Sequence, residues 1–437
     1  MKLPILIVIL FIFQFSANAK TFYVRTDGND NNQGTVNSEA GAWQTLNHAF
    51  NQLSGGDTLL INDGLFLVQP IELVEIHGTP EAPTVIAAIN QWEAKIRLKE
   101  NPEEGNTLVA FTCSYLEIDG LEVYGEAPNR GTGIEIAKGS HHVTIRNCYV
   151  HDCGCGGISG RGSDYITVER NVVRHNATRS KWNCSGISFL LAENFDDKPG
   201  YHMIIRNNVS FENECRFPFE HGGFDVPTDG NGIILDLFNN GINSTEEGEK
   251  GGYRSATLIE NNLSFNNGGR GINVFRSDNV TIRNNTTWHN LFVLSEYSDD
   301  KAEVETYEAK NTQWYNNLII QNEDLPVRAT SFHVYGDEGV ETANNIFVGE
   351  SHFWPNAPEK TKDKVLNKSE QKFAKLKKPT KNIKFKSVDD FEKYFGLKKG
   401  SPAIDEVINN YPNNDLNRNS RKMGKAADIG CYEYNGK

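Results

Sequence analysis

The sequence predicts an all-β protein, a right-handed single-stranded parallel β-helix: a three-sheet solenoid with an N-terminal cap and a C-terminal excursion and cap. Two observations predict this fold. A short phrase that usually ends in Asn recurs from residue 143 onward, and short segments of alternating apolar residues follow its copies, several of them starting at Gly. Repetition on a base period is typical of stacked solenoid coils.

The recurring phrase has alternating apolar residues before its final position. Its copies span residues 143–148, 166–171, 203–208, 257–262, 280–285, 312–317 and 340–345. Their sixth positions are therefore separated by intervals of 23, 37, 54, 23, 32 and 28. A base period of 23 with insertions accounts for every interval.

Each period also predicts two further strands. A second short strand follows the phrase, as at 209–211 and 263–265, and a third begins at a glycine, as at 133–136, 157–159, 186–189, 232–235 and 271–274. Strands this short cannot bury a face alone, so we expect successive coils to stack into three parallel sheets. We expect the recurring Asn at a tight corner, with a left-handed backbone and an amide bonded to the Asn of the next coil, and not as a glycosylation acceptor.

The composition excludes several other classes. With 437 residues, 38% hydrophobic and 23% charged, the chain is neither disordered nor a polytopic membrane protein. Its net charge of −13 argues against nucleic-acid binding. The stretch 360–399 holds fourteen Lys against five acidic residues, a local charge of +9 that leaves −22 for the rest. An anionic substrate would therefore need basic residues or a bound cation.

The N-terminus predicts export. Lys2 precedes an apolar run over residues 3–13, and residues 17–19 read Ala-Asn-Ala, the small residues of a cleavage site. This is the pattern of a signal peptide over residues 1–19, since a membrane anchor would need about twenty apolar residues. We expect the mature chain to begin at Lys20, to be secreted or periplasmic, and not to insert into a membrane.

Seven cysteines follow the signal segment, at positions 113, 148, 153, 155, 184, 215 and 431. An exported protein permits disulfides, and the odd number leaves at least one cysteine outside any pair. The single glycine between Cys153 and Cys155 is not the spacing of a zinc knuckle or a redox motif. We expect several of the cysteines to be small buried residues without a metal role.

The two ends of the chain carry a resemblance to a known family. Residues 22–30, 43–50 and 55–58 resemble the N-terminal cap and first coil, and residues 400–405 and 428–434 the C-terminal closure, of the pectate-lyase-like superfamily of secreted polysaccharide-active proteins. The resemblance covers almost the whole mature chain. It implies a cap and first coils over 20–105, coils with the active groove over 106–355, and the Lys-rich excursion and C-terminal cap over 356–437. Such helices host lyases, hydrolases, epimerases and passive binders.

The resemblance also implies a sugar-binding groove along the sheet of Gly-initiated strands. Alternation points the isoleucines at positions 134, 158, 187, 233 and 272 inward. It points outward Glu135, Ser159, Ser188, Ile234 and Asn273 in one column and Ala137, Arg161, Leu190, Asp236 and Phe275 in the other. Mixed polar, charged and aromatic side chains suit a saccharide. The candidate substrate-binding residues are Arg161, Asn273, Phe275, and, from a shorter insertion, Arg179 and Lys181.

Insertions locate the centre of the groove. The longest interval, from position 208 to position 262, exceeds the base period by 31, and long loops on a rigid coil often carry function. The candidate catalytic residues around this insertion are Glu220, His221, Asp229, Asp236, Arg270 and Arg276, and Asp225 is a further carboxylate. The alternatives are that Asp229 belongs to a turn, Asp236 is a solvated strand end and His221 packs within its loop.

Carboxylates beside basic residues permit two reactions. In β-elimination, an Arg or a cation neutralises a uronate carboxylate and a base removes the C5 proton. Ca²⁺ is the cofactor considered, with Asp225, Asp229 and Asp236 as candidate ligands, because it favours oxygen donors. In hydrolysis, two carboxylates such as Glu220, Asp229 or Asp236 flank the glycosidic bond.

We therefore expect a polysaccharide lyase that acts on a uronate-containing glycan, with a β-helix glycoside hydrolase or a non-catalytic glycan-binding surface protein as alternatives. No Lys occupies the first outward column, and residues 276–286 resemble the Lys-Ser…Asn-Thr signature of alginate and chondroitin lyases with Arg in place of Lys. The polygalacturonase signatures are missing, which disfavours pectin hydrolysis. We expect a monomer whose partner is a polysaccharide or oligosaccharide.

Overall fold

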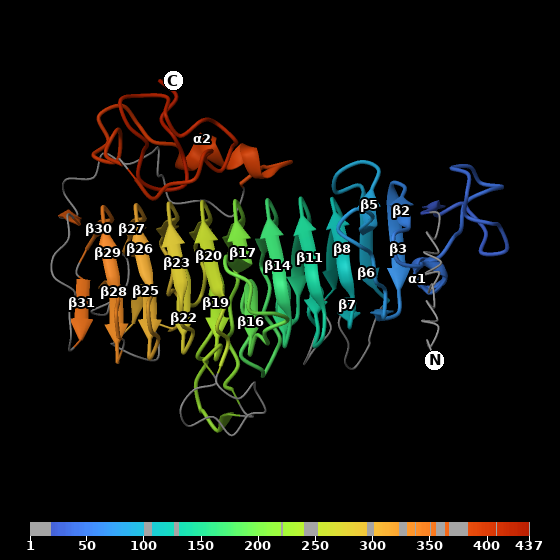
Figure 1. Ribbon diagram of the computed structural model, residues 1–437, viewed down its shortest axis with the longest axis horizontal. Coiled ribbons are helices and arrows are strands. Elements are labelled where there is room, and N and C mark those ends of the chain that lie inside the picture. Colours follow the sequence, from blue (N-terminus) through green and yellow to red (C-terminus); the bar gives the residue numbers. More distant parts are fainter. Residues whose placement is uncertain are drawn as a thin grey trace, which may run out of the picture.

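The computed structural model describes residues 19–99, 107–125, 131–219, 222–239, 252–294, 301–322, 330–336, 338–349, 351–354, 363–366, 383–407 and 409–436. Over this part the chain winds through three long parallel sheets whose strands stack coil upon coil along one axis (Figure 1). The described helices are short: α1 (Leu46–Gln52), α2 (Glu392–Phe395) and a 3₁₀ helix at Val388–Phe391. The predicted all-β, three-sheet solenoid is confirmed.

Each coil contributes one strand to each sheet, in the order A, B, C. Sheet A contains β1 (Thr21–Val24), β2 (Thr58–Ile61), β5 (Thr84–Ala88), β8 (Ser114–Asp119), β11 (His141–Arg146), β14 (Asp164–Glu169), β17 (Tyr201–Arg206), β20 (Ala256–Glu260), β23 (Val280–Arg283), β26 (Gln313–Tyr315) and β29 (Glu341–Ala343). Sheet B contains β3 (Gly64–Val68), β6 (Ala94–Leu98), β9 (Glu122–Gly125), β12 (Tyr149–Cys153), β15 (Val172–Arg174), β18 (Val209–Phe211), β21 (Leu263–Phe265), β24 (Thr286–Trp288), β27 (Leu318–Ile320), β30 (Ile346–Val348) and β32 (Lys364–Leu366). Sheet C contains β4 (Ile71–Val74), β7 (Leu108–Phe111), β10 (Ile134–Ile136), β13 (Ile158–Arg161), β16 (Ile187–Leu190), β19 (Ile233–Asp236), β22 (Ile272–Phe275), β25 (Ala302–Tyr307), β28 (Thr330–Tyr335) and β31 (Ser351–Trp354).

The core is a set of inward columns, one side chain per coil. The isoleucines predicted to point inward from sheet C are all fully buried, at positions 134, 158, 187, 233 and 272. They stack in register from strand to strand. Because every coil adds an apolar side chain to each column, coils that cannot bury a face alone do so against their neighbours.

The recurring phrase makes the corner between sheets A and B, and two adjacent residues share the role predicted for one Asn. Its fifth position has a left-handed backbone, with φ between 52° and 57° at residues 147, 170, 207, 261, 284, 316 and 344. Its sixth position forms a ladder of side-chain amides in which each donates to the next coil, through Asn171, Asn208, Asn262, Asn285, Asn317 and Asn345. The predicted structural role of the Asn residues is confirmed.

A second amide ladder explains why the strands of sheet C begin with glycine. Asn176, Asn213, Asn267 and Asn290 each follow a member of the first ladder in the same coil and are likewise bonded coil to coil. A Cβ at Gly157, Gly186, Gly232 or Gly271 would come within 2.5–2.8 Å of the amide nitrogen of the Asn beneath it. The backbone of sheet C therefore passes too close to this ladder for any side chain.

The C-terminal segment differs from the prediction. Residues 383–436 do not cover the open end of the solenoid; they lie along its side, over several coils (Figure 1). Phe391 and Phe395 pack against Phe211 and Phe265 of sheet B, and backbone carbonyls of the segment accept from ladder-corner residues such as Asn284. The predicted C-terminal cap therefore does not close the end of the coils, because its aromatic side chains are buried against the outer face of sheet B. Residues 360–362 and 367–382 of the Lys-rich stretch lie outside the described residues.

The cysteines follow the prediction of mostly buried thiols. Cys155 and Cys184 form a disulfide, and Cys113, Cys148, Cys153, Cys215 and Cys431 are reduced and buried. The signal peptide was predicted over residues 1–19, and residues 1–18 lie outside the described residues. None of the described helices has the length and apolar character needed to cross a membrane.

Candidate functional site

The outer face of sheet C carries two columns of side chains in register. The first runs through Glu135, Ser159, Ser188, Ile234 and Asn273 and continues to Glu305 and His333; the second runs through Arg161, Leu190, Asp236 and Phe275 and continues to Tyr307 and Tyr335. The strand pairing thus agrees with the faces assigned from alternation. The residues of the longest interval flank β19, and the candidate site lies on the outer face of sheet C from β19 to β28.

An ion-paired cluster lies on three neighbouring strands of this groove. Arg270 immediately precedes β22, and its Nη2 donates to Glu305 of β25 at 2.9 Å. His333 of β28 contacts the same carboxylate, with 2.9 Å between Nδ1 and Oε2. Arg270 and Glu305 are only 6% and 4% exposed, so their attraction is weakly screened by water.

The two carboxyl groups near Arg270 have opposite electrostatic environments. Burial raises the pKa of Asp229 to about 6, although the charges of Arg270 and Lys301 and a hydrogen bond from Asn231 oppose this shift. Burial also disfavours ionised Glu305, but Arg270 and His333 outweigh it and lower the pKa of Glu305 to about 2. Near neutral pH the site therefore holds one permanently ionised carboxylate and one carboxyl group that can carry a proton.

Two polar atoms beside this cluster lack protein partners. Asn273 Oδ1 and Arg270 Nε are buried and make no hydrogen bond within the described part of the chain. Buried polar groups are normally satisfied. The hydrogen-bonding capacity of this acceptor and this donor is therefore not used by the described part of the chain.

The other end of the same strands carries a second group. Asp236 closes β19, Phe275 closes β22, and the guanidinium of Arg276 lies 5.0 Å from the Phe275 ring centre. Arg276 pairs with Glu308 at 2.7 Å. Phe275, Tyr307 and Tyr335 stack on one another, with centroids 5.0 and 4.8 Å apart. Because these faces meet each other, Phe275 presents mainly its ring edge to the groove.

The candidate calcium ligands do not meet. Asp225 is exposed in the loop before β19, Asp229 precedes the strand and Asp236 ends it. A strand rises about 3.3 Å per residue, so the backbone from Ile233 to Asp236 alone spans about 10 Å. No group of three or more His, Cys, Asp or Glu side chains in the described ranges is arranged to hold a metal ion. These residues do not fit one calcium site, and we derive no step through calcium.

The remaining predicted residues are spread around the groove. Arg161, Arg179 and Lys181 are exposed, on coils before β19. Glu220 and His221 lie outside the described residues. Of the predicted set, the structure brings together Asp229, Arg270 and Asn273 at one end of the strands and Asp236, Phe275 and Arg276 at the other.

Sequence reasoning missed Glu305, His333, Tyr307 and Tyr335, although the signal was present. The last two intervals of the phrase run from position 285 to 317 and from 317 to 345. Adding these two intervals in turn to Asn273 gives Glu305 and His333, and adding them to Phe275 gives Tyr307 and Tyr335. Their strands lack an initial Gly, which is why the glycine pattern did not find them.

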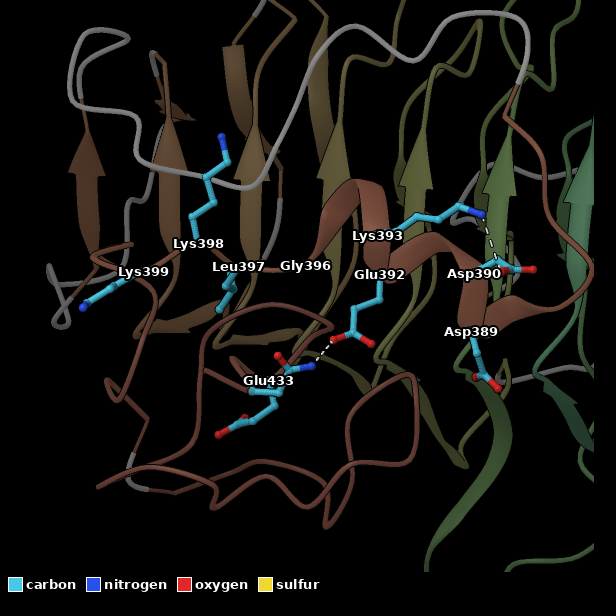
Figure 2. A pocket seen from close by; sticks show the side chains of 10 residues that line it. Asp389, Asp390, Glu392, Lys393, Gly396, Leu397, Lys398, Lys399 and Glu433 are labelled. Carbon is cyan, nitrogen blue, oxygen red and sulfur yellow. Dashed lines mark hydrogen bonds and ion pairs between the residues drawn. The ribbon is translucent and has the colours of Figure 1, made fainter. Parts of the chain in front are cut away.

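A cavity of about 420 Å³ lies elsewhere, in the C-terminal segment around α2 (Figure 2). Its acidic lining is engaged internally: Glu392 accepts from Asn417 and Asn435, each at 2.6 Å, and Asp390 lies 3.5 Å from Lys393. It lies on the side of the solenoid away from the loops around β19 (Figure 1). We place no function there.

The fold defines the class of protein: a parallel β-helix, which carries an ion-paired cluster on the outer face of one sheet. The chain belongs to the family described as Pel9A-like, right handed beta helix region, which matches residues 22–311 and confirms the predicted superfamily and handedness. Its structure is similar to the crystal structure of pectate lyase Pel9A, with a TM-score of 0.58 and 18% identity over 95% of this chain and 96% of that chain. It is also similar to a solved glycoside hydrolase, with a TM-score of 0.52 and 10% identity over 80% of this chain and 95% of that chain. No curated protein matches the sequence.

Proposed function

We propose that this protein is an exported carbohydrate-active enzyme that cleaves glycosidic bonds on the outer face of sheet C, by hydrolysis. The observation that carries the proposal is the pair of buried carboxyl groups that share the field of Arg270: Asp229, with its pKa raised to about 6, and Glu305, with its pKa lowered to about 2. Environments that push two carboxyl pKa values apart supply an acid and a base in one site.

The two groups then take the two roles of a glycosidase pair. Protonated Asp229 donates to the glycosidic oxygen as the bond breaks. Ionised Glu305, which Arg270 and His333 keep charged and oriented, activates a water molecule on the other side of the sugar. Their coils are two strand spacings apart, about 10 Å along the solenoid axis.

The pairing of the arginines favours a glycan that is neutral at the cleaved bond. Arg270 is held by Glu305 and Arg276 by Glu308. An elimination site needs a cation that is available to neutralise a uronate carboxylate, and both of these cations already have a carboxylate.

Digestion of a panel of neutral and uronate-containing polysaccharides tests the proposal. We expect new reducing ends without a rise in absorbance at 235 nm, and we expect Glu305→Gln to produce no new reducing ends. Absorbance at 235 nm that grows with the reducing ends would show elimination and would contradict hydrolysis. Binding of a glycan without any cleavage would show a non-catalytic groove.

Elimination on a uronate-containing glycan is the second candidate function, and the membership in a Pel9A-like family supports it. In that reaction Arg270 or Arg276 would have to leave its carboxylate partner to neutralise the uronate. Absorbance at 235 nm that grows with the reducing ends would favour this candidate over hydrolysis.

A further inference from the structure

Asn231 is a buried side chain that joins three coils at the groove. It is fully buried. Its Oδ1 accepts the backbone N–H of Arg270 at 2.8 Å, and its Nδ2 donates to Asp229 Oδ1 at 3.2 Å. One amide therefore contacts both the backbone that carries Arg270 and the carboxyl group of Asp229.

Ser185 holds Asn231 from the preceding coil. The Ser185 Oγ accepts from the backbone N–H of Asn231 at 3.1 Å and from its Nδ2 at 3.2 Å. In return, the N–H of Gly186 donates to the Asn231 carbonyl at 2.8 Å. Asn231 is thus fixed at both its backbone and its side chain by two consecutive residues of the neighbouring coil.

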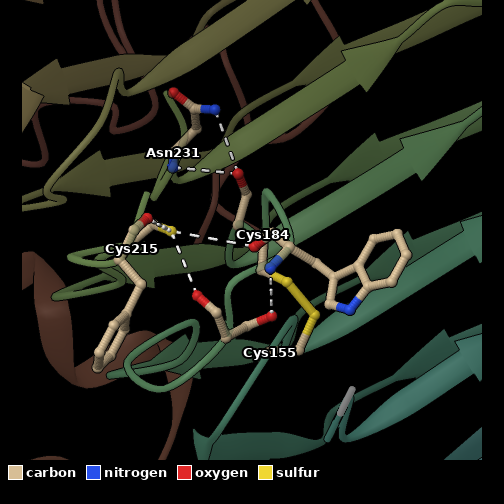
Figure 3. The surroundings of a disulfide bond; sticks show 8 residues. Cys155, Cys184, Cys215 and Asn231 are labelled. Carbon is tan, nitrogen blue, oxygen red and sulfur yellow. Dashed lines mark hydrogen bonds between the residues drawn. A yellow bond between two sulfur atoms is a disulfide. The ribbon is translucent and has the colours of Figure 1, made fainter. Parts of the chain in front are cut away.

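Those two residues follow directly after a disulfide. Cys184 is bonded to Cys155 of the coil before it, and the Cys184 carbonyl accepts the N–H of Gly230 at 2.9 Å. Figure 3 shows the disulfide and Asn231 on neighbouring coils of this corner. A covalent bond therefore anchors the segment against which residues 230 and 231 are hydrogen-bonded.

The coils themselves do not depend on this bond. Strands β13, β16 and β19 already pair along their length, and the two amide ladders bond these coils at their corners. The disulfide restrains the insertion before β16, because neither amide ladder contacts that insertion at Cys184. Its effect is therefore expected on local geometry.

We propose that the Cys155–Cys184 disulfide, Ser185 and Asn231 form a positioning unit that sets the Asp229 carboxyl group relative to Arg270, and that catalysis needs this unit more than folding does. The inference rests on the proposed function, because it assumes that Asp229 reacts. Small displacements of a reacting group cost large factors in rate, so the unit acts on kcat.

The test compares Cys155→Ser/Cys184→Ser with Cys113→Ser, which removes a buried thiol in a distant coil. We expect the double variant to keep the melting temperature of the control within a few degrees and to lose roughly ten- to a hundredfold in kcat, with KM changed little. A double variant that turns over at the rate of the control overturns the proposal.

Ser185→Ala covers the case in which the double variant does not fold, because it keeps the disulfide and removes only the hydroxyl that holds Asn231. We expect the same loss in kcat, and an unchanged kcat would overturn the inference. Asp229→Asn distinguishes a failure of the proposed function from a failure of the positioning unit. If Asp229→Asn stays active, the proposed function fails; if it is inactive while Ser185→Ala matches the wild type, only the positioning unit fails.

Discussion

At the scale of the residue, burial decides what Asp229 can do. Its side chain is 8% exposed, and desolvation outweighs the nearby positive charges. Glu305 is buried as deeply, but it contacts Arg270 and His333 directly. Burial thus raises the pKa of one carboxyl group, whereas two cationic neighbours lower the pKa of the other.

The pH dependence of activity follows from these two values. Asp229 must be protonated to act as an acid, so kcat should fall as pH rises through about 6. Glu305 stays ionised down to about pH 2, so no loss from Glu305 is expected between pH 3 and 6. A kcat–pH profile on the identified glycan checks this, and a rate that rises from pH 5 to 8 would contradict the acid role.

Substitution of the two aspartates flanking β19 locates the chemistry. Asp229→Asn keeps size and removes the transferable proton, so kcat should fall by about two or more decades. Asp236→Asn decides between two assignments of the second carboxylate. If Asp236→Asn also loses about two decades, the partner of Asp229 is Asp236; if only its KM rises while Glu305→Gln is inactive, the partner is Glu305. An unchanged melting temperature in Asp236→Asn, and a folded far-UV circular dichroism spectrum in all three variants, are the controls.

At the scale of the element, both amide ladders end on a carboxyl group. The first passes from Asn345 to Asp363 and the second from Asn290 to Glu303. Burial raises the pKa of Glu303 to about 8 and also raises the pKa of Asp363. A protonated carboxyl group resembles the amide that the next rung would supply, which accounts for its place at the end of a ladder.

Glu303 therefore links stability to pH. The folded state holds this proton up to about pH 8, whereas the unfolded chain releases it near its ordinary pKa of 4.5. Because the folded state binds more protons between these values, the Glu303 contribution should make stability fall as pH rises from about 4.5 to 8 and level off above. Glu303→Gln should reduce this fall in urea unfolding midpoints between pH 5 and 8, and an equal fall in both proteins would contradict it.

At the scale of the whole molecule, a buried arginine fastens the C-terminal segment to the coils. Arg421 is 1% exposed; it donates to Asn261 of the ladder corner and to the Gly430 carbonyl, and lies 3.7 Å from Glu433. Arg421 therefore links Asn261, in a coil, to a segment that lies 160 residues further along the chain.

Arg421→Ala should release this segment while leaving the coils folded. Removing one partner of a buried ion pair typically costs about 3–5 kcal/mol. Limited proteolysis should cut the wild type within the Lys-rich stretch 360–399, and the variant also within residues 400–436. Survival of a coil fragment ending before residue 360 in both digests is expected, and an uncut C-terminal segment in the variant would contradict the anchoring role.

The sequence by itself determined the solenoid, because short local motifs repeat with its period. The phrase at the A–B corners from residue 143 onward, the Gly before several strands of sheet C and the inward isoleucines follow from contacts between a residue and its equivalent one coil away. These contacts repeat at the intervals between copies of the phrase, so they can be predicted from the sequence. The same intervals, added to the position of Asn273, also give Glu305 and His333.

Only the tertiary structure decided which residues on the outer face of sheet C lie together. Asp229 and Asp236 are close in sequence, but the extended strand between them puts them at opposite ends of the groove. Arg270 and Glu305 are 35 residues apart and meet because their strands are neighbours. The C-terminal segment lies along sheet B, where its aromatic residues find a buried surface, and not over the open end. Each of these outcomes depends on which surfaces meet after the coils have stacked, and that is a property of the packed molecule and not of any local pattern.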